Sequence, residues 1–133
     1  MLKTQIGLEN YLIHVKSTNH RKCLSQLRLS NHKLMIETGR YQKIEVSKRV
    51  CYFCKTIVED EIHFVINCGT YSHLRRQILN ECLILKPNFE PYSDKEKFVF
   101  ILNNEQLQTV LAKFCFLANE LRAFLIKSPK SLS

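Results

Sequence analysis

The sequence contains no tryptophan and only three glycines and three prolines among its 133 residues. Tight turns between neighbouring strands depend on glycine and proline, so their scarcity argues against a many-stranded sheet and favours a helical chain. Long apolar runs are also missing. Residues 1–16 contain none behind a basic flank, so we expect neither a signal peptide nor a membrane span. With 45% apolar and 24% charged residues, the chain has a globular composition and the length of one domain.

Acidic residues are scarce in the first third of the chain. Residues 1–50 contain ten Lys or Arg residues and three acids, a net charge of +7, whereas residues 51–92 carry −1 and residues 93–133 carry +2. This asymmetry is typical of a phosphate-binding face, although the charge alone fits an ordinary soluble surface equally well. Six cysteines without a secretory signal indicate an intracellular compartment, nucleus or cytoplasm, where thiols bind metal more often than they pair.

Helical periodicity predicts that the basic segment at residues 1–50 is helical. Apolar residues recur at helical spacing over residues 8–15, and Thr18 or Asn19 can cap a second helix that follows. In residues 31–42, Leu34 and Ile36 alternate like a strand, but a short helix fits equally well. We favour the helix, and Gly39 fits its C-cap, because a left-handed C-cap position favours glycine.

Residues 51–85 combine a cysteine-rich stretch with an amphipathic helix, and residues 93–127 are predicted to form the C-terminal helices. In the amphipathic helix, Arg75 falls off the apolar face. Ser93 opens a capping box, and Asn103 looks like the start of a second one. The last helix has a broad apolar stripe, made of Leu107, Val110, Leu111, Phe114, Leu117, Leu121 and Phe124. We therefore expect one compact, mostly α domain whose last helix buries this stripe against the domain or a partner.

The cysteine-rich stretch has the spacing Cys51-x2-Cys54-x8-His63-x4-Cys68. Two cysteines separated by two residues can aim both thiolates at one point, and zinc takes four such donors in a tetrahedron. The alternatives are buried thiols with a satisfied core histidine, or a disulfide, which is strained between residues three apart. The spacing favours one zinc ion, and because four protein ligands close its coordination sphere, we expect a structural and not a catalytic site.

We expect this zinc knuckle to comprise a short hairpin followed by a short helix. The acids at residues 59–61 suit the positive end of a helix dipole, and His63 would follow in the first turns. Cys68 would reach back from the helix end, with Gly69 supplying backbone freedom. Cys82 and Cys115 lie on apolar helical faces and are expected in the core. His73 is a weaker alternative ligand.

The stretches LSQLRLSNHKLMIETGRYQ, RVCYFC and VEDEIHFVINCGTYSHLR resemble the C-terminal zinc-binding region of non-LTR (LINE-type) retrotransposon reverse transcriptases of animals. The match covers roughly residues 10–76. Gly69 departs from the pattern, because a proline is expected after the last cysteine. The resemblance implies an accessory module that helps to hold template RNA or target DNA, with a reverse transcriptase body as a possible partner.

The sequence has no pair of adjacent aspartates of the kind that polymerase metal chemistry needs, so we expect no enzyme and no small-molecule substrate. We expect non-catalytic RNA or DNA binding through phosphate contacts. The candidate contact residues are Arg21, Lys22, Arg28, His32, Lys33, Arg40, Tyr41, Lys43, Lys48 and Arg49. Two alternatives remain open: a protein-interaction module that docks through its apolar C-terminal helix, and a remnant without selected activity.

Overall fold

The computed structural model describes residues 18–30 and 32–127, and most of this part of the chain is helical, as predicted. The helix expected at residues 8–15 lies outside the described residues. No strand is present in the described ranges, and none of their helices is both long and apolar enough to cross a membrane.

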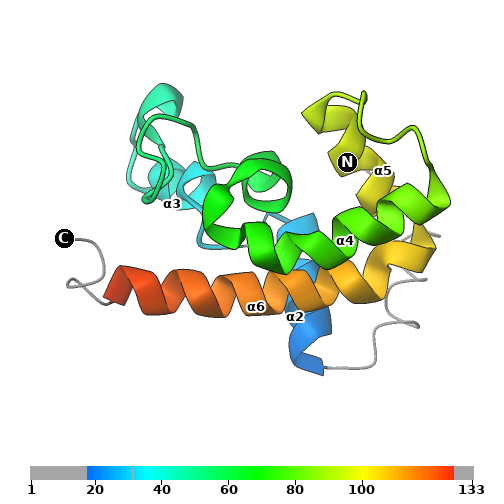
Figure 1. Ribbon diagram of the computed structural model, residues 1–133. Coiled ribbons are helices and arrows are strands. Elements are labelled where there is room, and N and C mark those ends of the chain that lie inside the picture. The colour runs from blue at the N-terminus through cyan, green and yellow to red at the C-terminus, as the bar shows by residue number, and fades with distance from the viewer. Residues whose placement is uncertain (1–17, 31, 128–133) are drawn as a thin grey trace.

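The C-terminal helix α6 (Gln108–Lys127) is the longest element of the described residues, and two other helices make most of its helix contacts. Figure 1 shows α4 (Ser72–Leu85) beside α6 and α2 (Thr18–Arg28) crossing it. The contact forms because each helix repeats small or apolar residues every three or four positions. The buried residues of these three helices include Leu24, Leu27, Ile78, Cys82, Leu111, Phe114, Cys115 and Ala118.

The core continues without interruption from α2 to α6, because the buried apolar side chains form one hydrophobic cluster. Its centre is aromatic: the Tyr71 ring lies 5.0 Å from the Phe64 ring and 6.4 Å from the Phe114 ring, centroid to centroid. Both contacts are edge-to-face, the arrangement that aromatic quadrupoles favour. These rings join the cysteine-rich segment to α6.

Helix α5 (Asp94–Asn103) begins where the sequence predicts. The Ser93 Oγ accepts from the Glu96 backbone N–H at 3.2 Å, and the Glu96 carboxylate accepts from the Ser93 N–H at 3.0 Å. The second predicted cap is wrong by one residue. Asn104, not Asn103, accepts a hydrogen bond at the start of the 3₁₀ turn η4 (Glu105–Leu107).

Helix α3 (Met35–Tyr41) confirms the short helix, but Gly39 is not its C-cap. Gly39 is a buried helical residue without a positive φ, and a Cβ there would lie 2.5 Å from Cγ of Arg49. Arg49 follows the 3₁₀ turn η1 (Val46–Lys48) and crosses α3 at this point. The glycine is therefore required by a close approach and not by a turn.

Candidate metal centre

Cys51 and Cys54 lie in a tight turn, which supports the knuckle but not the predicted hairpin. The Lys55 N–H donates to the Cys51 carbonyl at 2.8 Å, and the Cys51 N–H donates to the Ile57 carbonyl at 2.7 Å. A single antiparallel bridge, Val50 with Val58, stands where two strands were expected. Lys55 has a φ of 68°, the left-handed conformation that closes the turn.

His63 and Cys68 come together through a π-helical turn, η2 (His63–Asn67). Residues five apart do not share a stripe of an α-helix, but a π-turn pairs residue i with residue i+5. The Cys68 N–H accordingly donates to the His63 carbonyl at 2.7 Å. Asp60 fixes the start of this turn, since its carboxylate accepts from the His63 N–H at 2.8 Å. Gly69 opens the 3₁₀ turn η3 (Gly69–Tyr71) without a positive φ, so the expected need for glycine there is wrong.

The four donor atoms of Cys51, Cys54, His63 and Cys68 all lie within 4.8 Å of one another. The Cys68 Sγ is 3.8 Å from the Cys51 Sγ and 3.9 Å from the Cys54 Sγ. Thiolates bound to a tetrahedral zinc at about 2.3 Å would be roughly 3.8 Å apart. The sulfur positions therefore fit a metal ion without rearrangement, and the spacing is far too long for a disulfide.

Burial of three of the four donors gives a second reason why this cluster could hold a metal ion. Cys51 and Cys68 are fully buried and His63 is 3% exposed. Neither ring nitrogen of His63 has a hydrogen-bond partner among the described residues. A buried polar atom left unpaired costs roughly 1–3 kcal/mol, which a metal bond to one nitrogen would offset. Two of the thiols are also hydrogen-bonded to each other. The Cys51–Cys68 hydrogen bond raises the pKa of Cys51 and lowers the pKa of Cys68.

Arg75 supports the site from inside the core, although the sequence analysis placed it away from the apolar face of its helix. It is 5% exposed, and its guanidinium donates to the carbonyls of Val65 at 2.5 Å, Cys68 at 2.9 Å and Phe64 at 3.1 Å. These carbonyls belong to the last turn of the ligand-bearing helix, where intrahelical donors are lacking. Burial lowers the pKa of Arg75, and the nearby Cys68 thiol opposes that shift. Arg75 thus holds the backbone of a ligand in place and adds positive charge beside the thiols.

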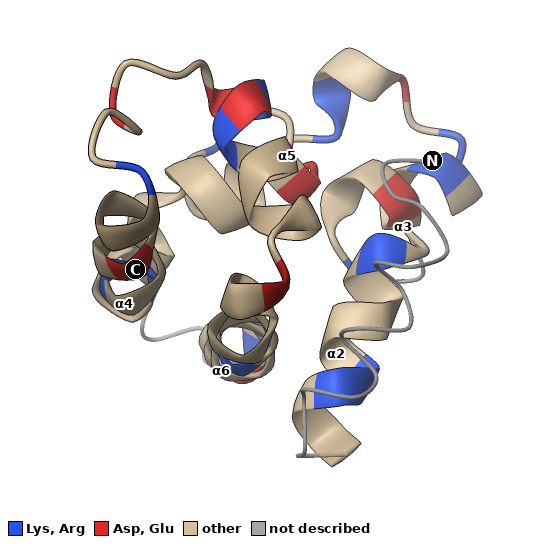
Figure 2. Cartoon of the chain, turned by 90° about the vertical axis from the view of Figure 1, so that its right-hand side faces the viewer, with Lys and Arg blue, Asp and Glu red and all other residues tan. Residues whose placement is uncertain are grey.

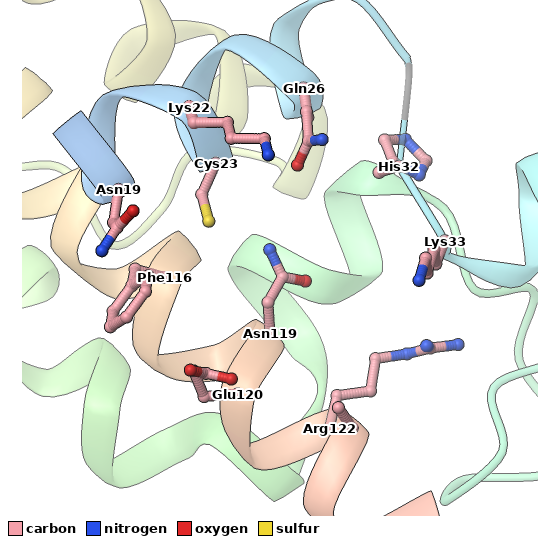
Figure 3. A pocket seen from close by; sticks show the side chains of 11 residues that line it. Asn19, Lys22, Cys23, Gln26, His32, Lys33, Phe116, Asn119, Glu120 and Arg122 are labelled. Atoms are coloured by element: carbon pink, nitrogen blue, oxygen red, sulfur yellow. The ribbon is translucent and has the colours of Figure 1, made fainter.

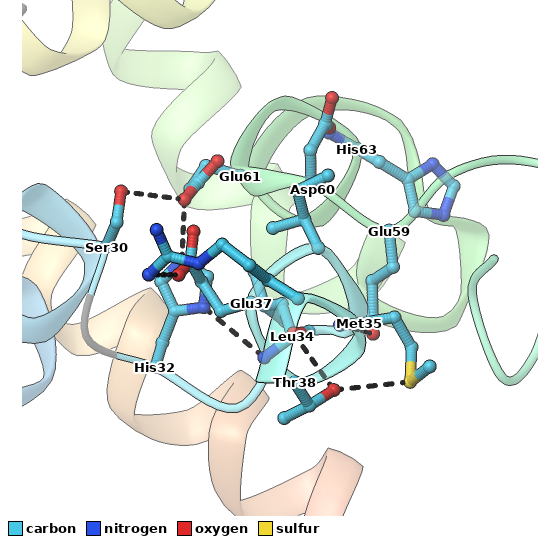
Figure 4. A network of polar contacts seen from close by, with 12 residues as sticks. Ser30, His32, Leu34, Met35, Glu37, Thr38, Glu59, Asp60, Glu61 and His63 are labelled. Carbon is cyan, nitrogen blue, oxygen red and sulfur yellow. Dashed lines mark hydrogen bonds and ion pairs between the residues drawn. The ribbon is translucent and has the colours of Figure 1, made fainter. Parts of the chain in front are cut away.

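The acids at residues 59–61 connect the cysteine-rich segment to the rest of the chain, a role that the helix-dipole argument did not anticipate. Glu59 is fully buried, and its carboxylate accepts from the Arg122 Nε at 2.9 Å and from the second guanidinium nitrogen at 2.7 Å. Burial disfavours the Arg122 charge, but Glu59 outweighs it and raises the Arg122 pKa. Glu59 also accepts from the Met35 N–H at 2.8 Å, which places it at the start of α3 (Figure 4).

Glu61 pairs with His32. The His32 ring is therefore not open to a nucleic acid, contrary to the prediction from the sequence. The His32 Nε2 lies 2.6 Å from a Glu61 carboxylate oxygen, and the His32 side chain is 6% exposed (Figure 4). Burial raises the pKa of Glu61, but the hydrogen bond with His32 reverses that effect and the pKa is lowered.

Two of the candidate phosphate-binding arginines also have internal partners. Arg28 donates to the Leu102 carbonyl at 2.6 Å and to the Gln108 side chain. Arg49 donates to the Ile44 carbonyl at 2.7 Å and the Ile36 carbonyl at 3.1 Å. A guanidinium bonded to carbonyls inside the fold is not available to a phosphate in the same geometry. The side chains of Arg28, His32 and Arg49 are therefore bonded inside the fold and are not presented to a nucleic acid, contrary to the prediction from the sequence.

The other candidates lie at the surface. Lys22, Lys33, Lys43, Lys48 and Tyr41 are exposed, and Arg21 is half-buried. Arg40 is exposed as well, but it pairs with Glu37 at 2.6 Å and lies over the Tyr41 ring. Figure 2 shows Lys and Arg positions recurring along α2 and the segment that follows it.

Cys82 and Cys115 lie in the core as predicted. Cys82 and Cys115 are fully buried, and burial raises the pKa of both thiols, to about 11 for Cys82. His73 is exposed and is not part of the donor cluster. In the described part of the chain, the cluster of donor atoms that could hold a metal ion thus consists of the four predicted ligands.

No family model matches this chain, and no curated protein or solved structure matches it either. The resemblance to the retrotransposon region consequently stays a prediction. The functional argument rests on the donor cluster and on the charges around it.

Proposed function

We propose that this chain is a non-catalytic module that holds one structural zinc ion and binds RNA or DNA through phosphate contacts. The observation that carries the proposal is the set of three cysteines and one histidine, buried except for the half-buried Cys54, whose donor atoms all lie within 4.8 Å of one another. The resemblance to the accessory region of a retrotransposon reverse transcriptase supports the same class of function.

Zinc fits the donor set better than other common ions. Thiolates and imidazole suit zinc, whereas magnesium and calcium take oxygen ligands. Bound by four protein groups, zinc would contribute folding free energy. Cys51 and Cys54 would hold it from the turn, and His63 and Cys68 from the two ends of η2.

The positive field supports the choice of a polyanionic partner. Four of the lysines in the basic segment at residues 1–50, Lys22, Lys33, Lys43 and Lys48, have no ion-pair partner among the described residues. Lysines of this kind release counterions when they bind phosphates, which gives affinity with little sequence readout.

Metal content is the first test. Protein purified without chelator should contain one zinc per chain, and a strong chelator should reduce its helical circular dichroism signal, because Cys51 and Cys68 lie in the core. Cys82→Ser is a control for the choice of cysteines. It alters a fully buried cysteine outside the donor cluster, so it should leave the metal content unchanged. Protein without metal and with an unchanged spectrum after chelation would contradict the proposal.

Salt-titrated binding is the second test. Affinity for single-stranded and duplex oligonucleotides should fall steeply between about 50 and 200 mM salt, as expected for several phosphate contacts. Replacing Lys43 and Lys48 by glutamine should reduce the slope of log Kd against log salt by roughly 1 for each phosphate that is no longer neutralised. Lys95→Gln, at an exposed position of α5, is the control. An affinity that does not depend on salt would exclude phosphate binding.

A protein-interaction module is the second candidate, and exposed apolar side chains favour it. Phe124 is 64% exposed and Leu117 37% exposed on α6, so part of the predicted stripe is not covered by the described residues. Under this alternative, the chain would self-associate or bind the body of a polymerase. Self-association that disappears in Phe124→Asp, without any salt-dependent nucleic-acid binding, would favour it over the first proposal.

A further inference from the structure

A cavity of about 480 Å³ lies between α2 and α6, separate from the metal-ligand cluster (Figure 3). Its size falls in the range of small-ligand sites. Two residues that line the cavity are paired with acids near the metal-ligand cluster: His32 with Glu61, and Arg122 with Glu59. The side chains of His32 and Arg122 are therefore held in place by carboxylates.

One end of the cavity is aromatic. The Phe116 ring lines it, and the His20 ring lies 5.0 Å from Phe116 between centroids, tilted by 41°. A half-buried phenyl ring at the wall of an open cavity offers a face on which a flat ring can stack. Nucleobases stack on such rings irrespective of their identity, because every base has a π face.

Amide side chains line the middle of the cavity. Asn119, from α6, and Gln26, from α2, each provide one acceptor and two donors, the combination that reads the edge of an unpaired base. In Figure 3 the Asn119 amide and the Cys23 sulfur point toward each other. Burial raises the pKa of Cys23, so its thiol is neutral and adds no negative charge to the wall.

The entrance carries positive charge. Lys22 and Lys33 line the cavity from α2 and from the segment before α3, and both are exposed. Glu120 also lines it and opposes them in part. The Arg122 charge is compensated by Glu59, and Lys22 and Lys33 outnumber Glu120, so an excess of positive charge is left at the rim.

We propose that this cavity binds one unpaired nucleotide of a single-stranded nucleic acid, with the base against Phe116 and its phosphate at Lys22 and Lys33. The inference rests on the proposed function and deepens it, because it makes the module select single strands over duplexes. In a duplex the bases are stacked on one another and their pairing edges are occupied, so neither Phe116 nor Asn119 could engage them.

The test compares three fluorescent probes of equal length, roughly twelve nucleotides each: a single strand, its duplex, and an abasic strand with the same phosphates. Fluorescence anisotropy at one fixed salt concentration gives each Kd. The proposal predicts that the single strand binds at least ten times more tightly than the abasic strand. Phe116→Leu should weaken single-strand binding by roughly 5- to 100-fold and leave abasic-strand binding unchanged.

Phe124→Leu is the matched control, because it makes the same change at an exposed position of the same helix. Asn119→Leu is the second variant; it keeps a side chain of similar size and adds no charge but removes the amide, so it should also weaken only the binding of strands that carry bases. Zinc content and circular dichroism establish that each variant is folded.

The outcomes separate the two proposals. Equal affinities for the three probes, or variants that bind the single strand like the unaltered protein, would overturn the nucleotide site and leave phosphate binding intact. Absence of binding to every probe would overturn both.

Discussion

Replacing Arg75 by methionine should destabilise the protein strongly, because this arginine makes three hydrogen bonds inside the core. Its donors reach the carbonyls of Phe64, Val65 and Cys68 at 3.1, 2.5 and 2.9 Å. A hydrogen bond to a charged group contributes roughly 1.5–3 kcal/mol, and the three are not fully additive. We therefore expect the free energy of unfolding to fall by about 3–5 kcal/mol, much of a typical domain's total stability.

The same substitution should weaken zinc binding, since Arg75 holds the backbone of the ligand Cys68. Loss of a group that orients a ligand commonly reduces metal affinity by roughly 10- to 100-fold. Urea denaturation followed by circular dichroism, at saturating zinc, measures the stability change. Competition with a chromophoric chelator measures the metal Kd.

Arg76→Met is the matched control for this experiment. Arg76 is the next residue of α4 and is exposed, so the same change should shift the free energy of unfolding by no more than about 0.5 kcal/mol. If Arg75→Met and Arg76→Met had equal stabilities and equal zinc affinities, the structural role assigned to Arg75 would be wrong.

Three further substitutions test the packing around the site, each by urea denaturation of the zinc-loaded protein. Gly39→Ala should destabilise by about 1–3 kcal/mol, because the new Cβ would lie 2.5 Å from Cγ of Arg49 and displace its hydrogen bonds. Arg122→Met should cost about 3–5 kcal/mol, because it leaves the Glu59 carboxylate buried without its partner. Lys55→Gly should stabilise by up to about 1 kcal/mol, because Lys55 has a φ of 68° that glycine adopts without a steric penalty.

Each of these substitutions has a control. In an Arg49→Ala background, Gly39→Ala should become stabilising, since only the helix propensity of alanine remains. Glu59→Gln combined with Arg122→Met should recover part of the lost stability, because neither residue of this pair then carries a buried charge. Thr56→Gly, at an exposed residue without a positive φ, should not stabilise. A control that behaved like its test substitution would refute the corresponding argument.

The cluster of possible metal ligands could be predicted from the sequence because its parts are local. All four ligands lie within eighteen residues, and the spacing of a knuckle limits where their side chains can meet. The detail that was missed, the π-helical turn, reconciles the five-residue spacing of His63 and Cys68 with a common metal site. The helices and the Ser93 cap were predictable for the same reason, since periodicity and capping depend on neighbours a few positions away.

The roles of the charged residues were not predictable in this way. Arg28 donates to a carbonyl 74 residues further along the chain, and Arg122 bonds Glu59 across 63 residues. Helical periodicity placed Arg75 off the apolar face, yet it is buried because the end of η2 lies beside α4 and needs its donors.

The sequence by itself thus determined the helical class, the cluster of cysteine and histidine donors that could hold a metal ion, and the excess of positive charge. Only the tertiary structure decided which cations serve the fold and which face solvent. The physical reason is that a long polar side chain can be buried wherever distant segments supply unpaired carbonyls or carboxylates, and those partners become neighbours only when the chain has folded.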